Sequence, residues 1–246
     1  MSIFELPVSF SLDKHPVVAS RFSGYNKRKI HTKNQEGAMK KAPFFHCYEE
    51  MKMCGRYYID SDMAAEIQQV VREVDQRIRK AQFTGDIHPT ESAPVIEKSE
   101  NGLKLSMCKW GYPLSKRKSL VINARVESVM DKASFRNGIL YHRVLIPASG
   151  FYEWNWLKEK NTFTRPDARV LYMTGFCDWF ENERRFVILT TKANASMKKV
   201  HERMPLILEK EQIVDWFQNE KMEKLLQYTP IMLKREAEYE QQSLFL

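Results

Sequence analysis

The sequence predicts an α+β fold, and three observations carry that prediction. Short apolar stretches with strand composition dominate the middle of the chain, helical patterns lie outside them, and no βαβ unit repeats. A repeating βαβ pattern would have indicated an α/β fold with a parallel sheet, so its absence favours α+β.

The first strand and the first helix follow one another near residue 60. Residues 57–59 are a short strand, and Ser61 is a candidate N-cap for a helix that runs to about Lys80. We expect one face of this helix in the core, namely Met63, Ile67, Val70, Val71, Val74 and Ile78.

Turn signals separate the strands of the middle. Residues 86–96 form a proline-containing loop that enters a strand, and Asn101-Gly102 predicts a hairpin turn into a returning strand at 103–110. Further strands are expected at 120–122, 143–148, 150–154, 169–177 and 184–191, and short helices at 211–217 and 222–226.

Composition excludes several classes of protein. With 246 residues, 43% of them hydrophobic, the chain can bury a sizeable core. Its four cysteines form no Cys-x-x-Cys pair and its histidines do not cluster, which argues against a zinc site and for free thiols in a reducing compartment. No apolar run is long enough to predict a membrane span, and no signal peptide is indicated.

The net charge is +8, shared between two parts of unequal length. Residues 1–53 hold nine Lys/Arg against five Asp/Glu, giving +4, and residues 54–246 hold 30 against 26, giving the other +4. This balance is compatible with a nucleic-acid partner and equally with scattered surface lysines.

The stretch Met53-Cys54-Gly55-Arg56-Tyr57 has the character of a protein N-terminus. A cysteine in first position carries a thiol and an α-amine on adjacent carbons, and this pair can condense with an aldehyde to a five-membered thiazolidine. We therefore expect residues 1–53 to be a poorly ordered extension. They arise either from a start codon placed too early, since 49–53 can be encoded by GAG GAG AUG AAA AUG, or as a propeptide; a permanent extension would abolish the free-amine chemistry.

Several motifs agree in order and spacing with one known family. They are Met53-Cys54-Gly55-Arg56, His88-Pro89-Thr90, Trp110-Gly111, Asn123-Ala124-Arg125-x-Glu127, Arg143-x-x-x-Ile146-Pro147-Ala148-x-Gly150-Phe151-Tyr152-Glu153-Trp154 and His201-x-Arg203-Met204-Pro205. Together they resemble the SRAP family of SOS response-associated peptidases, or abasic-site processing proteins. The resemblance covers residues 54–246 and implies a mixed, mostly antiparallel, open barrel-like β-sheet core with peripheral helices.

The resemblance also implies a function. It is the covalent capture of abasic sites in single-stranded DNA, and no metal or cofactor is implied. We expect a monomer in the cytoplasm, associated with the nucleoid when it is bound to DNA. The implied catalytic residues are Cys54 as the crosslinking nucleophile, Asn123 as an orienting group, and Glu153 and His201 as proton-transfer groups. Residue chemistry adds candidate DNA contacts: Arg56, Arg125 and Arg203 for phosphates, and Trp110 and Trp154 for stacking on bases.

Other interpretations of the same residues stay open at this point. Structural explanations are a salt bridge for Glu153, a surface position for His201, a turn cap for Asn123, core packing for the tryptophans and an ion pair for Arg125. Two other functions also fit the sequence. One is a thiol-dependent peptidase that removes its own propeptide before Cys54, and the other is a non-catalytic module that binds single-stranded nucleic acid.

Overall fold

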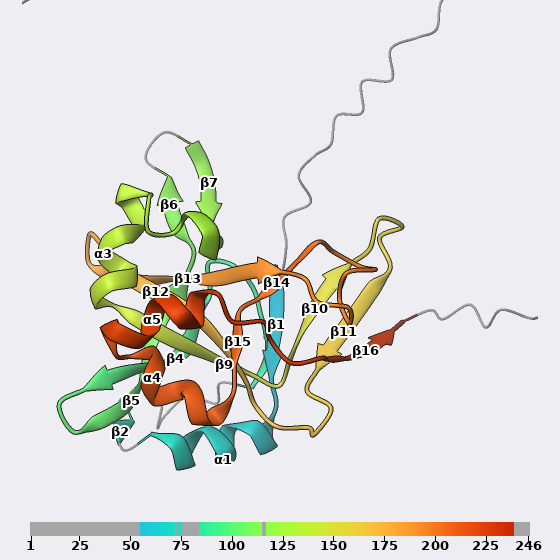
Figure 1. Cartoon of the computed structure of the whole chain (residues 1–246), viewed down its shortest axis with the longest axis horizontal. Coiled ribbons are helices and arrows are strands. Elements are labelled where there is room, and N and C mark those ends of the chain that lie inside the picture. The colour runs from blue at the N-terminus through green and yellow to red at the C-terminus, as the bar shows by residue number, and fades with distance from the viewer. Residues whose placement is uncertain (1–54, 72, 75–83, 115–116, 239–246) are drawn as a thin grey trace, which may run out of the picture. The chain divides into compact units, whose positions relative to one another are not determined.

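The computed structural model describes residues 55–71, 73–74, 84–114 and 117–238. The predicted extension at residues 1–53, and Cys54 itself, lie outside these described residues. Most described elements are strands, and they form two large sheets and one hairpin (Figure 1).

The smaller of the two large sheets has five strands and is antiparallel throughout. Its order is β16-β11-β10-β1-β3, with each pairing antiparallel. The strands are β1 (Arg56–Ile59), β3 (Gly85–Ile87), β10 (Gly150–Trp154), β11 (Lys160–Thr164) and β16 (Lys234–Ala237).

Five strands of the larger sheet close into a barrel. They are β4 (Ser92–Ser99), β5 (Gly102–Trp110), β9 (Arg143–Ala148), β12 (Leu171–Phe180) and β13 (Glu183–Lys192). Antiparallel pairing runs β5-β4-β9-β12-β13, and a short parallel pairing of Lys109 with Arg185 and of Trp110 with Phe186 joins β5 back to β13. The α+β fold with a barrel-like, mostly antiparallel core is therefore confirmed, and the barrel is closed.

Short strands extend this barrel at its margins. β8 (Asn123–Arg125) and β14 (Arg203–Pro205) pair with β13, β15 (Ile207–Leu208) pairs with β12, and β2 (Glu73–Val74) pairs with β5. A separate hairpin consists of β6 (Tyr112–Leu114) and β7 (Arg117–Val121).

The helices lie outside the strands, as expected for this fold class (Figure 1). They are α1 (Ser61–Val70), α3 (Ala133–Tyr141), α4 (Ile213–Trp216) and α5 (Asn219–Leu226), with 3-10 turns η1 (Val126–Ser128) and η2 (Lys210–Gln212).

Arg143 ties three of these helices to the barrel. Its guanidinium donates to the backbone oxygens of Trp216 at 2.7 Å and Ile139 at 2.8 Å, and to Asn219 Oδ1 at 2.8 Å. Burial lowers the pKa of this arginine, and its hydrogen bonds satisfy helix-end carbonyls that would otherwise lack partners. Arg143, the first residue of the longest motif, therefore has a structural role.

Helix α1 is shorter than the sequence pattern predicts. It ends at Val70, Val71 is already extended, and β2 follows. Two adjacent β-branched valines favour extended backbone, and β2 pairs with β5 instead of continuing the helix. The cap also differs from the prediction, because Asp60 Oδ1, not Ser61, accepts from the Met63 amide at 2.9 Å.

A buried ion pair connects two strands of the barrel, β4 and β13. Glu97 on β4 accepts from Arg184 Nη1 at 2.9 Å and Nη2 at 2.6 Å, and the Ser106 hydroxyl also donates to it. Arg184 Nη2 lies 2.9 Å from Cys177 Sγ. The pKa of Glu97 is lowered, because the hydrogen bonds from Arg184 and Ser106 outweigh desolvation.

Candidate functional site

The pairing of β1 with β10 brings the start of β1 beside Glu153. The register places Tyr57 opposite Phe151, so continuing it by two residues brings Gly55 opposite Glu153. Glu153 is only 3% exposed and shares the inward face of β10 with Phe151. A carboxyl group costs free energy to bury, so its presence on an inward face makes it a candidate for chemistry.

A chain of aromatic contacts joins this inward face to Asn123. The Tyr57 ring lies 5.3 Å from the Trp110 ring, which stacks on Phe186 with 6.0 Å between centroids. Trp110 Nε1 donates to the backbone oxygen of Ile122 at 3.0 Å, and Ile122 immediately precedes Asn123. Trp110 is completely buried, so the prediction that it stacks on DNA bases is wrong. In its observed position, Trp110 binds the backbone immediately before β8.

Asn123 begins β8, one of two short strands that flank the same stretch of β13. The parallel register places Asn123 opposite Ile188 and Arg125 opposite Thr190. On the other side of β13, Pro205 of β14 is also opposite Thr190. The Oδ1 atom of Asn123 is shielded from solvent. β13 therefore links Asn123 to the segment that precedes β14, where His201 lies.

The backbone around His201 determines which of its ring nitrogens carries a proton. The Arg203 amide donates to Nδ1 of His201 at 2.9 Å, and the His201 amide donates to the Met197 carbonyl at 3.0 Å. Because an amide can only donate, Nδ1 must be the accepting nitrogen, and the neutral ring carries its proton on Nε2. The neutral, half-buried imidazole therefore has a hydrogen-bond donor at Nε2.

Arg203 makes a bidentate ion pair with Glu127. Its Nη1 and Nη2 atoms donate to the two carboxylate oxygens at 2.6 and 2.8 Å, and Nη2 also donates to the Thr190 carbonyl at 2.6 Å. The hydrogen bonds from Arg203 lower the pKa of Glu127. Arg203 is 9% exposed. We therefore correct the prediction of a phosphate contact: this guanidinium fastens β14, and with it His201, to the loop after β8.

The other two predicted phosphate ligands are accessible. Arg56 lies over the Trp154 ring, 5.5 Å from its centroid, and 3.6 Å from Asp86, and a third of its side chain is exposed. Arg125, at the end of β8, is exposed. Both can reach a ligand without breaking a buried contact.

The outward face of the five-stranded sheet carries aromatic residues that the sequence interpretation did not assign. Tyr58 and Tyr152 stack with 5.3 Å between centroids, and Lys160 Nζ lies 4.9 Å from the centre of the Tyr152 ring. Burial, together with a hydrogen bond to Asp86, raises the pKa of Tyr152 to about 12. The strand pairing that brings these residues together has no local signal, but the aromatic alternation along β10 was visible.

Of the predicted catalytic residues, Asn123, Glu153 and His201 are described, and Cys54 is not. Tyr57 pairs with Phe151, two residues before Glu153, and contacts Trp110, which binds the carbonyl of Ile122 beside Asn123. The strand β14, which follows His201, pairs with the same part of β13 as β8. Gly55 is the described residue nearest in sequence to the predicted nucleophile.

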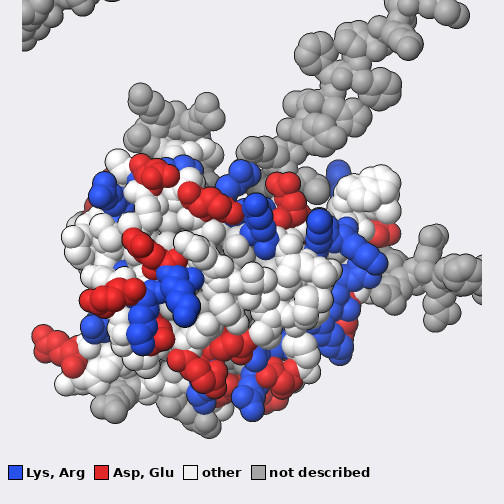
Figure 2. All heavy atoms as spheres, in the orientation of Figure 1, with Lys and Arg blue, Asp and Glu red and all other residues white. Residues whose placement is uncertain are grey.

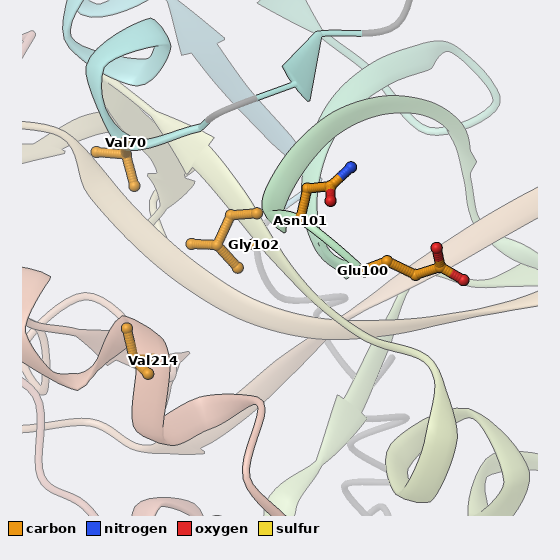
Figure 3. A pocket seen from close by; sticks show the side chains of 6 residues that line it. Val70, Glu100, Asn101, Gly102 and Val214 are labelled. Atoms are coloured by element: carbon orange, nitrogen blue, oxygen red, sulfur yellow. The ribbon is translucent and has the colours of Figure 1, made fainter.

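A hollow of about 670 Å³ lies away from these residues (Figure 3). It is lined by Val70, Glu100, Asn101, Gly102, Leu103 and Val214, from the end of α1, the β4–β5 turn and α4. None of them belongs to β1, β8, β10 or β14. We assign no chemistry to this hollow.

The described residues contain neither a metal-binding cluster nor a membrane-spanning helix. No group of three or more His, Cys, Asp or Glu side chains in that part of the chain is arranged to hold a metal ion. None of its helices is long and apolar enough to cross a membrane.

Comparison with known proteins gives a consistent result. The family model described as SOS response associated peptidase (SRAP) matches residues 53–242. The abasic site processing protein YoqW of Bacillus subtilis is 29% identical over 180 residues, covering 67% of this chain and 80% of the relative. YoaM of the same organism, also named an abasic site processing protein, is 27% identical over 180 residues, covering 67% and 78%.

A crystal structure of a protein from Bordetella bronchiseptica has the same fold. It superimposes with a TM-score of 0.63 at 22% identity, covering 75% of this chain and 99% of that one.

Proposed function

Because this chain belongs to the SOS response associated peptidase (SRAP) family, we propose that it processes abasic sites in DNA. In this proposal it captures the aldehyde of an abasic site in single-stranded DNA as a covalent thiazolidine, with Cys54 as the first residue of the active chain. The names of its relatives, abasic site processing proteins, support the substrate class.

One observation carries the proposal: the buried residue Glu153 lies on the strand that pairs with β1, across from the beginning of β1. Gly55 continues the β1 register opposite Glu153, and Cys54 is bonded to Gly55, so their Cα atoms are about 3.8 Å apart whatever the conformation of Cys54. A residue that must react through its terminal amine is therefore covalently attached next to a candidate acid.

The chemistry needs one acid and one proton acceptor. The Cys54 amine adds to C1′ of the ring-opened sugar to give a carbinolamine, and loss of its hydroxyl as water leaves an imine. The thiol sulfur then bonds to the same carbon while its proton passes to nitrogen, so the adduct equals protein plus DNA less one water. Glu153 as an acid protonates the departing hydroxyl.

His201 and Asn123 complete the set. With its proton on Nε2, His201 can donate to the sugar oxygen and promote ring opening. Asn123, at the start of β8, offers an amide that can hold the sugar or the amine in place. Arg56 and Arg125 are placed to neutralise phosphates, and the half-buried Trp154 beneath Arg56 offers part of its ring to a base.

Exposure of Cys54 can require a peptidase step. The family description includes the word peptidase, and 53 residues precede Cys54. Cleavage between Met53 and Cys54 by the Cys54 thiol would release this extension. A product that begins at residue 54 in wild type but not in Cys54→Ala supports this step. Translation from Met53 would instead give the same first residue position in both proteins.

The test is intact-mass analysis after incubation with single-stranded DNA that contains one abasic site. Wild type is expected to gain the mass of the oligonucleotide less one water. Cys54→Ser keeps the amine, so it should form an imine that survives only after borohydride reduction, and Cys108→Ser should react like wild type. A wild-type chain beginning at Cys54 that gains no mass would overturn the proposal and favour a module that binds without reacting.

A further inference from the structure

The turn between β10 and β11 exposes two adjacent apolar side chains. Trp156 is 77% exposed and Leu157 is 54% exposed. An exposed tryptophan keeps a large apolar surface in water, which is unfavourable unless something covers it during function.

The turn holds this pair in a defined conformation. Asn155 Oδ1 accepts from the amides of Leu157 and Glu159, both at 3.0 Å, and its amide nitrogen donates to the Glu159 carboxylate at 2.6 Å. The Asn155 backbone closes the turn through bonds to Glu159 and Lys158. Lys158 adopts a positive φ of 63°. A contact made by Trp156 therefore costs little ordering entropy in the backbone.

The position of Trp156 relative to the proposed site follows from the strand. It lies three residues after Glu153, which limits the distance between their Cα atoms to about 10 Å. Tyr152 and Trp154 alternate along β10, which ends at Trp154, and Trp156 follows in the adjoining turn. The three aromatic residues are therefore close together in the chain, at the end of the strand that carries Glu153.

Positive charge surrounds this row of aromatic residues. Lys160 lies over Tyr152 and Arg56 over Trp154, and Lys158 is exposed beside Trp156. In Figure 2 Lys and Arg side chains gather along the right edge, over the strands β10, β11 and β16. An aromatic surface bordered by cations matches the chemistry of nucleotides, with bases for the rings and phosphates for the charges.

We propose that Trp156 is a stacking platform for a base of the DNA strand within about two nucleotides of the captured abasic site. This inference rests on the proposed function and adds a binding residue to it. A second protein is a poorer occupant, because two side chains offer far less than the roughly 800 Å² per partner of a stable interface.

The experiment measures DNA affinity separately from covalent capture. A single-stranded oligonucleotide with a tetrahydrofuran residue at the lesion has no aldehyde, so its binding can be followed by fluorescence anisotropy without crosslinking. Trp156→Ala should bind about 5- to 150-fold more weakly than wild type, as expected for the loss of one base-stacking contact. Trp156→Phe should keep most of the affinity.

Two features distinguish stacking from a general disturbance. Stacking releases no counterions, so Trp156→Ala should leave the slope of log affinity against log salt unchanged. Trp179→Ala removes another exposed tryptophan, 60% exposed on β12, and should bind like wild type. A 2-aminopurine one or two nucleotides from the lesion should be quenched by wild type and not by Trp156→Ala.

The outcomes separate this inference from the proposed function. Affinity of Trp156→Ala within about twofold of wild type overturns the stacking platform, even where wild type crosslinks normally. So does a loss of affinity that accompanies a change of oligomeric state in sedimentation velocity. If wild type forms no covalent product with a true abasic site but Trp156→Ala still loses affinity, the capture chemistry fails and stacking stands.

Discussion

Removing the Arg203 side chain tests whether this motif arginine binds DNA or positions His201. Arg203→Met deletes three hydrogen bonds of 2.6–2.8 Å, to Glu127 and Thr190, and leaves a carbonyl and a carboxylate without their donor. Breaking a fully buried pair costs about 3–5 kcal/mol. The Glu127 side chain is 45% exposed and can be hydrated after the change, so we expect about 1–3 kcal/mol.

The consequence for activity should exceed the consequence for stability. The Arg203 amide fixes Nδ1 of His201, so a displaced β14 removes the orientation of the proposed proton donor. Loss of one general acid costs about 10²–10⁴ in rate. We therefore expect slower crosslinking at a temperature where the variant is still folded, with little change in affinity for the tetrahydrofuran oligonucleotide.

Urea denaturation, single-turnover crosslinking and the salt dependence of binding together check this prediction. Glu127→Gln is the matched variant, because it weakens the same pair from the other side. The double variant should be destabilised by less than the sum of the two single effects. If Arg203→Met lowers the slope of log affinity against log salt by about 1 while Glu127→Gln does not, Arg203 contacts a phosphate and the structural explanation fails.

Three further predictions concern stability. Glu97→Ala should lower the free energy of unfolding by about 3–5 kcal/mol at neutral pH, because Arg184 loses its buried partner. Since the folded-state pKa of Glu97 is lowered, its contribution is complete above its unfolded pKa and disappears as pH falls through the folded value, so urea titrations of wild type and variant should converge in acid. Trp110→Ala should cost about 3–5 kcal/mol from its fully buried site, while the folded variant keeps its affinity for the tetrahydrofuran oligonucleotide; a loss of affinity of about 5-fold or more would restore its assignment to the interface. Asp60→Ala should cost about 1 kcal/mol by removing the cap of α1, whereas Ser61→Ala should have little effect; equal effects in thermal melts would contradict the observed cap.

Local chemistry explains which elements were predictable. The Asn101-Gly102 turn joins β4 to β5 as expected, with Ser99 paired to Gly102. The strands at residues 143–148 and 150–154 match β9 and β10 in full, because apolar runs bounded by small turn residues carry their own signal. Helix α3 was missed, since its buried residues are few and include Gly138, where a Cβ would lie 2.5 Å from the Phe176 ring.

Long-range pairing explains the rest. The barrel closes where Trp110 pairs with Phe186, and no local pattern announces a parallel contact between residues so far apart in the chain. The same closure buries Trp110, which is why its assignment as a stacking platform failed. Composition favours an indole equally for a core and for a base-binding surface, and only the sheet order decides between them.

Some motif residues make their contacts within the protein, and others keep an exposed side chain. This difference explains why the motifs alone assigned more DNA-binding residues than the structure supports. Trp110 and Arg203 have residue types suited to DNA, yet each is occupied within the protein: one supports the backbone before Asn123, and the other fastens the backbone of His201. Each contacts a residue that we propose to be reactive, or the backbone beside it. A positioning residue and a reactive residue can therefore both belong to the motif set, and we expect variants at both to slow crosslinking. They differ in the free energy of unfolding, which should fall for Trp110 and Arg203 variants and stay near wild type for a residue such as Arg125, whose exposed side chain is left to bind DNA.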